Sequence, residues 1–198
     1  MIRQFKFILI IVVIVSTIVQ VAILALAIWI KRWPFFEYLG LVLPSKRDAI
    51  VWLLLLDGFV ILIETTLYLT GHGDLSPFQL DTYKSAKAVF ALPQLLLAIV
   101  FFAPLAEEIT FRGFLYAGLM RYPQSSTNAI IAVTITAIGW TLLHTQYDLV
   151  GMCEVFIMGI FLGTVRWKTG STLLTIALHM SLNTQAMIET AAKIEGFL

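Results

Sequence analysis

The sequence predicts an all-α fold, a polytopic transmembrane bundle of about six helical spans. Hydrophobic residues make up 60% of the 198 residues and charged residues 13%, whereas soluble domains average about 45–50% and about 25%. The mean hydropathy is +0.93, and long apolar runs recur along the chain. No run shows the alternation of a transmembrane β-strand, and lipid does not tolerate open sheet edges, so the spans are expected to be helices.

Six apolar runs are the expected spans. The first is too long for a signal-peptide core and no small-residue cleavage site follows it, so we expect it to be retained. The third contains Pro93 and Pro104, which predict a kink or a break. Very short loops separate the last three spans, which should therefore be antiparallel neighbours. The runs cover residues 7–30, 49–69, a stretch within 88–120, 129–144, 149–165 and 171–188.

A polar loop over residues 70–87 divides the chain into two regions. Residues 1–87 hold the first two spans and this loop, and they carry no catalytic motif. Residues 88–198 hold the remaining spans and three clusters of polar residues where lipid-facing residues would otherwise stand. We expect this second region to form a catalytic helical core.

The first polar cluster combines two glutamates and an arginine in the third span. Ionisable residues at mid-bilayer cost at least about 2.5–3.5 kcal/mol each, so they need partners or a function. Glu108 and Arg112 are four residues apart on one helix face, which predicts an ion pair. Glu107 lies about 100° around the helix and has no basic partner three or four residues later. Such a carboxylate suits general-base chemistry, although both glutamates could instead tie helices together.

Two further clusters lie in the fourth and sixth spans. His179 and Asn183 share a helix face and could bind a developing oxyanion, with interhelical hydrogen bonding as the alternative. Trp140 and His144 share another face near the end of the fourth span, where an interfacial histidine beside an aromatic anchor is the alternative. Together with Glu107, these residues are typical of a hydrolytic site.

In their order and spacing, the three clusters resemble the motifs of the CPBP family, also called Abi. Its members are CAAX-processing type II endopeptidases and bacteriocin-processing or self-immunity membrane proteins. The similarity covers about residues 94–188. The tryptophan of the second motif stands where phenylalanine is common, and we interpret its ring as packing. The shared elements are EExxxR at 107–112 with FRG at 111–113, (F/W)xxxH at 140–144 and HxxxN at 179–183.

The resemblance implies an intramembrane endopeptidase of the glutamic type. It implies that Glu107 is the catalytic base, that His144 positions and activates a water, and that His179 and Asn183 form the oxyanion hole. The carboxylate would deprotonate the water, the hydroxide would attack a peptide carbonyl, and the proton would pass to the leaving amine. The supporting residues would be Glu108 and Arg112.

Other chemistries are less well matched by the sequence. No GxSxG elbow is present, and Cys153, the single cysteine, has no obvious neighbouring base, which disfavours nucleophilic catalysis. Zinc-dependent proteolysis stays open because glutamate and histidine bind zinc. However, HExxH is absent and asparagine is a poor zinc ligand, so we expect no metal and no cofactor.

The second alternative is not an enzyme. The chain could be a bacteriocin immunity or accessory membrane protein that keeps the motifs as structure. In either case the expected partners are membrane lipid and a peptide or protein, and the net charge of +1 gives no reason to expect nucleic acid. The small size favours a multi-pass protein of a bacterial cytoplasmic membrane.

Overall fold

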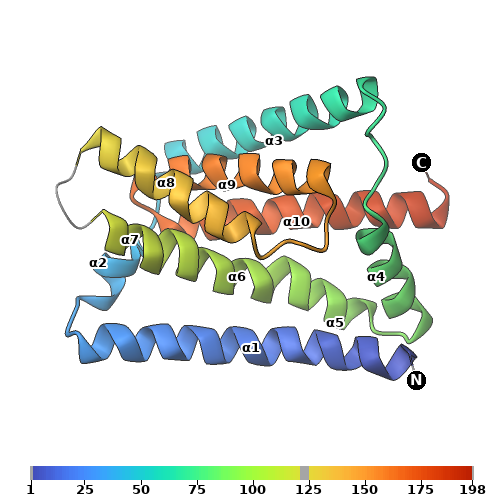
Figure 1. Ribbon diagram of the computed structural model, residues 1–198, viewed down its shortest axis with the longest axis horizontal. Helices are drawn as coiled ribbons and strands as arrows, with labels where there is room; N and C mark the ends of the chain where they lie inside the picture. The colour runs from blue at the N-terminus through green and yellow to red at the C-terminus, as the bar shows by residue number, and fades with distance from the viewer. Residues whose placement is uncertain (1, 121–124, 198) are drawn as a thin grey trace.

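A computed structural model describes residues 2–120 and 125–197, in which the regular elements are helical and most of the long helices run roughly along one axis (Figure 1). Four segments are long and apolar enough to cross a membrane, namely Ile11–Ile30, Lys46–Leu69, Leu92–Leu119 and Leu149–Thr169. A shorter apolar helix and the last helix run beside them, which confirms the predicted bundle of about six spans. In chain order the helices are α1 (Ile2–Ile30), α2 (Phe35–Leu39), α3 (Lys46–Leu69), α4 (Pro77–Ala88), α5 (Leu92–Leu96), η1 (Leu97–Phe102), α6 (Ala103–Glu108), η2 (Ile109–Leu115), α7 (Tyr116–Leu119), α8 (Ser126–Thr141), α9 (Leu149–Thr169) and α10 (Thr172–Glu195).

The helices α1 and α3 lie on opposite outer sides of the bundle (Figure 1). They expose large apolar side chains such as Ile23 and Leu54, which are 60% and 66% exposed. A surface of this kind is stable against lipid and not against water. The elements that carry the polar clusters, α6, η2, α8 and α10, lie between these two helices.

Polar caps begin four of the long helices. Each cap side chain accepts a hydrogen bond from a first-turn backbone N–H, which the helix itself leaves without a partner. At the end of α9, Gly170 adopts the left-handed conformation (φ 69°), so the chain turns at once into α10. The caps are Ser45 for α3, Ser125 for α8, Asp148 for α9 and Ser171 for α10.

The central span from α5 to α7 is one continuous helix with two π-helical stretches, η1 and η2. Pro104 lies in the first turn of α6, directly after η1. A proline has no N–H to donate and its ring crowds the carbonyl of the preceding turn, and a wider π turn leaves room for it. The helix therefore widens at the predicted kink and does not break. The two π-helical stretches flank Glu107 and Glu108.

The helices α8 and α9 pack closely through two glycines. A Cβ built on Gly159 would lie 3.0 Å from the Cβ of Ala137, and one on Gly163 would lie 2.8 Å from a methyl group of Val133. The GxxxG pattern of α9 is therefore used inside the chain. This close approach places the end of α8, with Trp140, directly against α9.

Candidate active site

The ion pair between Glu108 and Arg112 is fully buried. The Nη1 of Arg112 donates to Oε1 of Glu108 at 2.8 Å, and both side chains are 0% exposed. The Nη2 of Arg112 donates to the Gly159 carbonyl of α9 at 3.1 Å. The pair that the four-residue spacing predicts is present, and it ties the central span to α9.

His179 of α10 lies between the two glutamates. Its Nδ1 is 3.0 Å from Oε1 of Glu108. The Glu108 carboxylate beside Arg112 is ionised and can only accept, so this nitrogen carries the proton. The other ring nitrogen, Nε2, lies 3.9 Å from Oε2 of Glu107. This distance is too long for a direct hydrogen bond, but it allows one water molecule to contact both atoms.

Glu107 is the more accessible of the two glutamates, because its side chain is 25% exposed whereas that of Glu108 is fully buried. Its Oε2 accepts a hydrogen bond of 2.6 Å from Nε1 of Trp140. The sequence predicted that Glu107 has no basic partner within the next helical turn, and this donor is an indole and not a basic group; the ring of Trp140, predicted to pack, also donates this hydrogen bond. The donor comes from α8, and positions three or four residues along the central span cannot reveal it.

Trp140 is the residue around which the polar groups gather. Its ring meets His144 and His179 edge-on, with centroids 5.0 and 5.2 Å away. The guanidinium of Arg112 lies over the same ring at 4.6 Å. A buried indole N–H needs an acceptor. A tryptophan in an apolar span therefore indicates a nearby acceptor, and this signal could have identified Trp140 as a partner of a glutamate.

His144 lies just after α8, in the loop over residues 142–148. Its Nδ1 is 2.9 Å from the Trp140 carbonyl. A carbonyl can only accept, so Nδ1 carries the proton and Nε2 of the neutral ring is free to accept one.

Tyr147, in the same loop, stacks on His144 with 6.1 Å between ring centroids. Burial, and then the nearby charges of Glu107 and Glu154, raise the pKa of its phenol. The phenol therefore stays protonated at neutral pH and can donate a hydrogen bond. No sequence pattern singles out Tyr147, because only the folded loop brings it to the histidine.

Asn183, one turn after His179, contacts a different part of the central span. Its Nδ2 donates to the Ile99 carbonyl of η1 at 2.8 Å. In the π-helical pattern this carbonyl would bond to the N–H of residue 104, which is a proline. Asn183 therefore supplies the donor that Pro104 lacks. Its second amide N–H is not used in this bond.

The side chains that could bind zinc are those of the His, Cys, Asp and Glu residues. Zinc takes three or four protein ligands, and among the described residues no group of three or more His, Cys, Asp or Glu side chains is placed to hold a metal ion. The nearest candidate donors are engaged elsewhere, since Glu108 pairs with Arg112 and His179 pairs with Glu108.

The long apolar helices with exposed apolar side chains define an integral membrane protein. Its glutamate–histidine site lies inside the helical bundle, behind the apolar outer surface. Residues 89–185 match the family model described as type II CAAX prenyl endopeptidase Rce1-like. Through this half of its length the chain belongs to that family of membrane proteases, in agreement with the three sequence motifs.

A similarity search among curated proteins finds a bacterial relative. Over 162 residues, the chain is 26% identical to an uncharacterized 24.3 kDa protein of Escherichia coli, and the match covers 80% of this chain and 71% of that protein. No solved structure matches the chain significantly.

Proposed function

We propose that this chain is a CAAX-type intramembrane endopeptidase that activates a water molecule with Glu107. Membership of the protease family supports peptide-bond hydrolysis. One observation carries the mechanism: Oε2 of Glu107 and Nε2 of His179 face each other at 3.9 Å, on the accessible side of a sealed ion pair. A water in contact with both atoms meets a carboxylate base and an imidazole at the same time.

The proposed reaction needs no covalent intermediate. Glu107 takes a proton from the water as its oxygen attacks the carbonyl carbon of the scissile peptide bond. The same proton then passes from Glu107 to the leaving nitrogen, and the C–N bond breaks to give a carboxylic acid and an amine. Trp140 holds the Glu107 carboxylate in place through its N–H.

His179 and Asn183 are the proposed oxyanion donors. In this proposal His179 enters the reaction as an imidazolium: its Nδ1–H is held by the Glu108 carboxylate, and its Nε2 carries a proton taken from solvent before the reaction, donates it in a hydrogen bond to the oxyanion and keeps it throughout. Asn183 keeps its bond to Ile99 and offers its second N–H. We assign His144 the orientation of the water, because Nε2 of its neutral ring is an acceptor.

We propose that no metal takes part in this chemistry. The donors at the site are paired with one another in the way acid–base catalysis requires. Cleavage should therefore persist in 1,10-phenanthroline. Loss of cleavage that added zinc restores would instead show a metalloprotease.

The proposed substrate is a membrane-associated peptide or protein. The family description points to a prenylated CAAX tail, and peptide leaders or other membrane-anchored segments are the further candidates. The bacterial relative supports a bacterial cytoplasmic membrane as the location. In that membrane, lipid surrounds the bundle and the substrate reaches the site from the lipid or its surface.

An assay with a defined probe tests the proposal. The full chain in lipid nanodiscs is given an internally quenched peptide that ends in a farnesylated CAAX sequence, and in parallel the same peptide without the farnesyl group. Glu107→Gln should lower the cleavage rate by about 10²–10⁴-fold, the range that general-base catalysis contributes. Glu195→Gln, the same chemical change at a partly exposed position far from the site, should leave the rate unchanged.

Two outcomes would contradict the proposal. Cleavage that survives Glu107→Gln would remove Glu107 from the mechanism. A folded wild-type chain that binds both peptides and cleaves neither would favour the non-enzymatic immunity or accessory role.

A further inference from the structure

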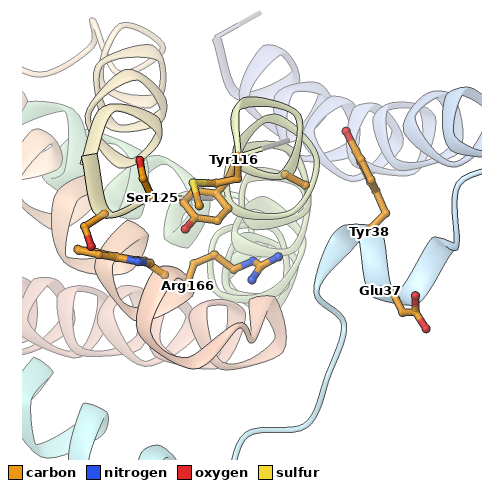
Figure 2. Close-up of a pocket in the computed structure, with 9 residues that line it drawn as sticks. Glu37, Tyr38, Tyr116, Ser125 and Arg166 are labelled. Carbon is orange, nitrogen blue, oxygen red and sulfur yellow. The ribbon is translucent and has the colours of Figure 1, made fainter. Parts of the chain in front are cut away.

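A polar cavity is formed by elements that meet at the end of the bundle away from the chain termini (Figure 1). It has a volume of about 640 Å³ and is lined by residues of α2, α7, α8 and α9. Figure 2 shows Arg166, Tyr116 and Ser125 gathered on one side of it, with Tyr38 and Glu37 on the other. Its lining residues are separate from the candidate catalytic residues, so its chemistry is not explained by the proposed protease.

Arg166 is the main charge in this cavity. Its side chain belongs to a residue that is only 9% exposed, and its Nε donates to the Arg112 carbonyl at 3.0 Å. Its guanidinium lies 5.2 Å from the Tyr116 ring. It occupies the space beside Gly40, where a Cβ would lie 2.4 Å from Nη2. Among the described residues, the hydrogen bond of this guanidinium is made by Nε, and its two terminal nitrogens are not sealed from solvent, so they are donors open to the cavity.

An acidic side chain in the cavity does not neutralise this charge. Glu37 is exposed at the rim, and in Figure 2 its carboxylate points away from Arg166. A guanidinium that is largely removed from water and has no anionic partner loses part of its hydration, which costs free energy. A bound anion would remove that cost and would satisfy the open N–H donors.

The start of α8 offers a second group of donors to the same cavity. Ser125 caps this helix of 16 residues and Ser126 is its first residue, and both line the cavity. The Ser125 hydroxyl accepts from the Asn128 N–H, which leaves the N–H groups of Ser126 and Thr127 without an intrahelical acceptor. The positive end of the helix dipole adds to the guanidinium charge, a combination that binds phosphate groups in other folds.

The surroundings favour a lipid as the source of that phosphate. This end of the bundle carries more basic than acidic side chains, and basic residues next to spans attract anionic headgroups. Trp167 lines the cavity, and the Lys168 ammonium lies 4.0 Å from the centre of its ring, as at a lipid–water interface. The described charged side chains at this end are Lys31, Arg32, Lys46, Arg47, Arg166 and Lys168, with Glu37 and Asp48.

We propose that this cavity is a binding site for the phosphate of an anionic phospholipid headgroup, held between the Arg166 guanidinium and the first N–H groups of α8. The site goes beyond the proposed proteolysis and does not depend on it. The proposal predicts saturable binding of a lipid molecule at this site, in contrast to the non-specific layer of lipid around the spans.

The test uses the full chain in mild detergent. Phosphatidylglycerol is titrated against it, with bound lipid counted by native mass spectrometry and the thermal unfolding midpoint recorded. We expect one saturable lipid and a higher midpoint, and weaker binding of phosphatidylcholine because its headgroup carries its own cation. A separate arm replaces the lipid with sodium phosphate, to distinguish a headgroup from a free phosphate.

A matched pair of variants locates the site. Ser126→Glu puts a carboxylate in the cavity while still favouring the helix, since acidic residues stabilise a first turn. It should weaken phosphatidylglycerol binding by about tenfold or more, the size of a lost charge-assisted contact. Thr127→Glu makes the same change of charge on the next residue, which does not line the cavity, and should cause a clearly smaller loss.

Each outcome has a defined meaning. Equal binding by both variants and the wild-type chain would overturn the proposal, as would the absence of a saturable lipid. A midpoint raised by sodium phosphate as much as by lipid, and lost in Ser126→Glu, would keep the anion site and overturn the lipid as its source. Arg166→Gln should weaken phosphatidylglycerol binding in the same way. The unfolding midpoint of this variant without lipid measures how much Arg166 contributes to the stability of the fold itself.

Discussion

Trp140 donates its only N–H to Glu107, and phenylalanine would keep most of the ring while removing this donor. We predict that Trp140→Phe lowers kcat/KM by about tenfold or more, because a hydrogen bond to a charged group contributes about 1.5–3 kcal/mol. Its thermal unfolding midpoint should fall less than that of Trp140→Ala, which also loses packing. The quenched-peptide assay and a thermal scan measure the two effects. Unchanged kcat/KM would mean that the indole acts only by packing.

Glu108 and Arg112 neutralise each other where water does not enter. We predict that Glu108→Gln alone lowers the free energy of unfolding by about 3–5 kcal/mol, because it leaves the Arg112 charge buried and unpaired. The double variant Glu108→Gln/Arg112→Met should recover a large part of this loss. Activity should stay low in both, since His179 loses its anionic partner. Unfolding in denaturant with enzyme assays measures both effects, and a double variant no more stable than Glu108→Gln would contradict the prediction.

The sequence predicted contacts between residues that are close along the chain and missed contacts between residues that are far apart. The pair of Glu108 and Arg112 is local to one helix, so its spacing alone indicated the contact. The bond between Trp140 and Glu107 and the approach of Tyr147 to His144 require the packing of α8 and the course of its following loop. A sequence motif identifies residues of this kind as candidates, but it does not predict which side chains they contact.

At the scale of the helix, Asn183 compensates for a defect that Pro104 creates. We predict that Asn183→Ala destabilises the fold by about 1–3 kcal/mol, because the Ile99 carbonyl loses its donor. Pro104→Ala restores a backbone N–H, so Asn183→Ala/Pro104→Ala should lose less than the two single changes add up to. Thermal unfolding of the four proteins measures this coupling. Strict additivity would show that the two residues act independently.

Hydropathy predicted the long helices, since a run of about 20 apolar residues is what lipid requires. It could not predict the π-helical stretches. The first stretch is accompanied by a hydrogen bond from Asn183 of another helix to the Ile99 carbonyl. A pattern of apolar residues does not predict a contact of this kind. At Pro104, where the sequence predicted a kink or a break, the helix stays continuous and widens into a π-helical stretch.

For the whole molecule, the ends of the helices predict sidedness. The loop before α4 and the end of α10 lie at one end of the bundle, and the loop between α2 and α3 lies at the other (Figure 1). In a Cys153→Ser background, we predict that Asp74→Cys and Phe197→Cys react with an impermeant maleimide from one side of the membrane and Leu43→Cys from the other. Labelling of intact cells and of inverted vesicles measures this. Reaction of all three from the same side would contradict the arrangement of spans.

The π-helical stretches also limit how the length of this chain can vary. Losing one residue from Leu97–Phe102 would restore regular α-helical pairing, but it would rotate the preceding turns by about 100° relative to the rest of the span. Leu95, now buried with Tyr83 and Met187, would leave that core, and the exposed Gln94 would turn towards it. Deletions should therefore be rare between residues 97 and 115 among homologues, even where the residue types there change freely.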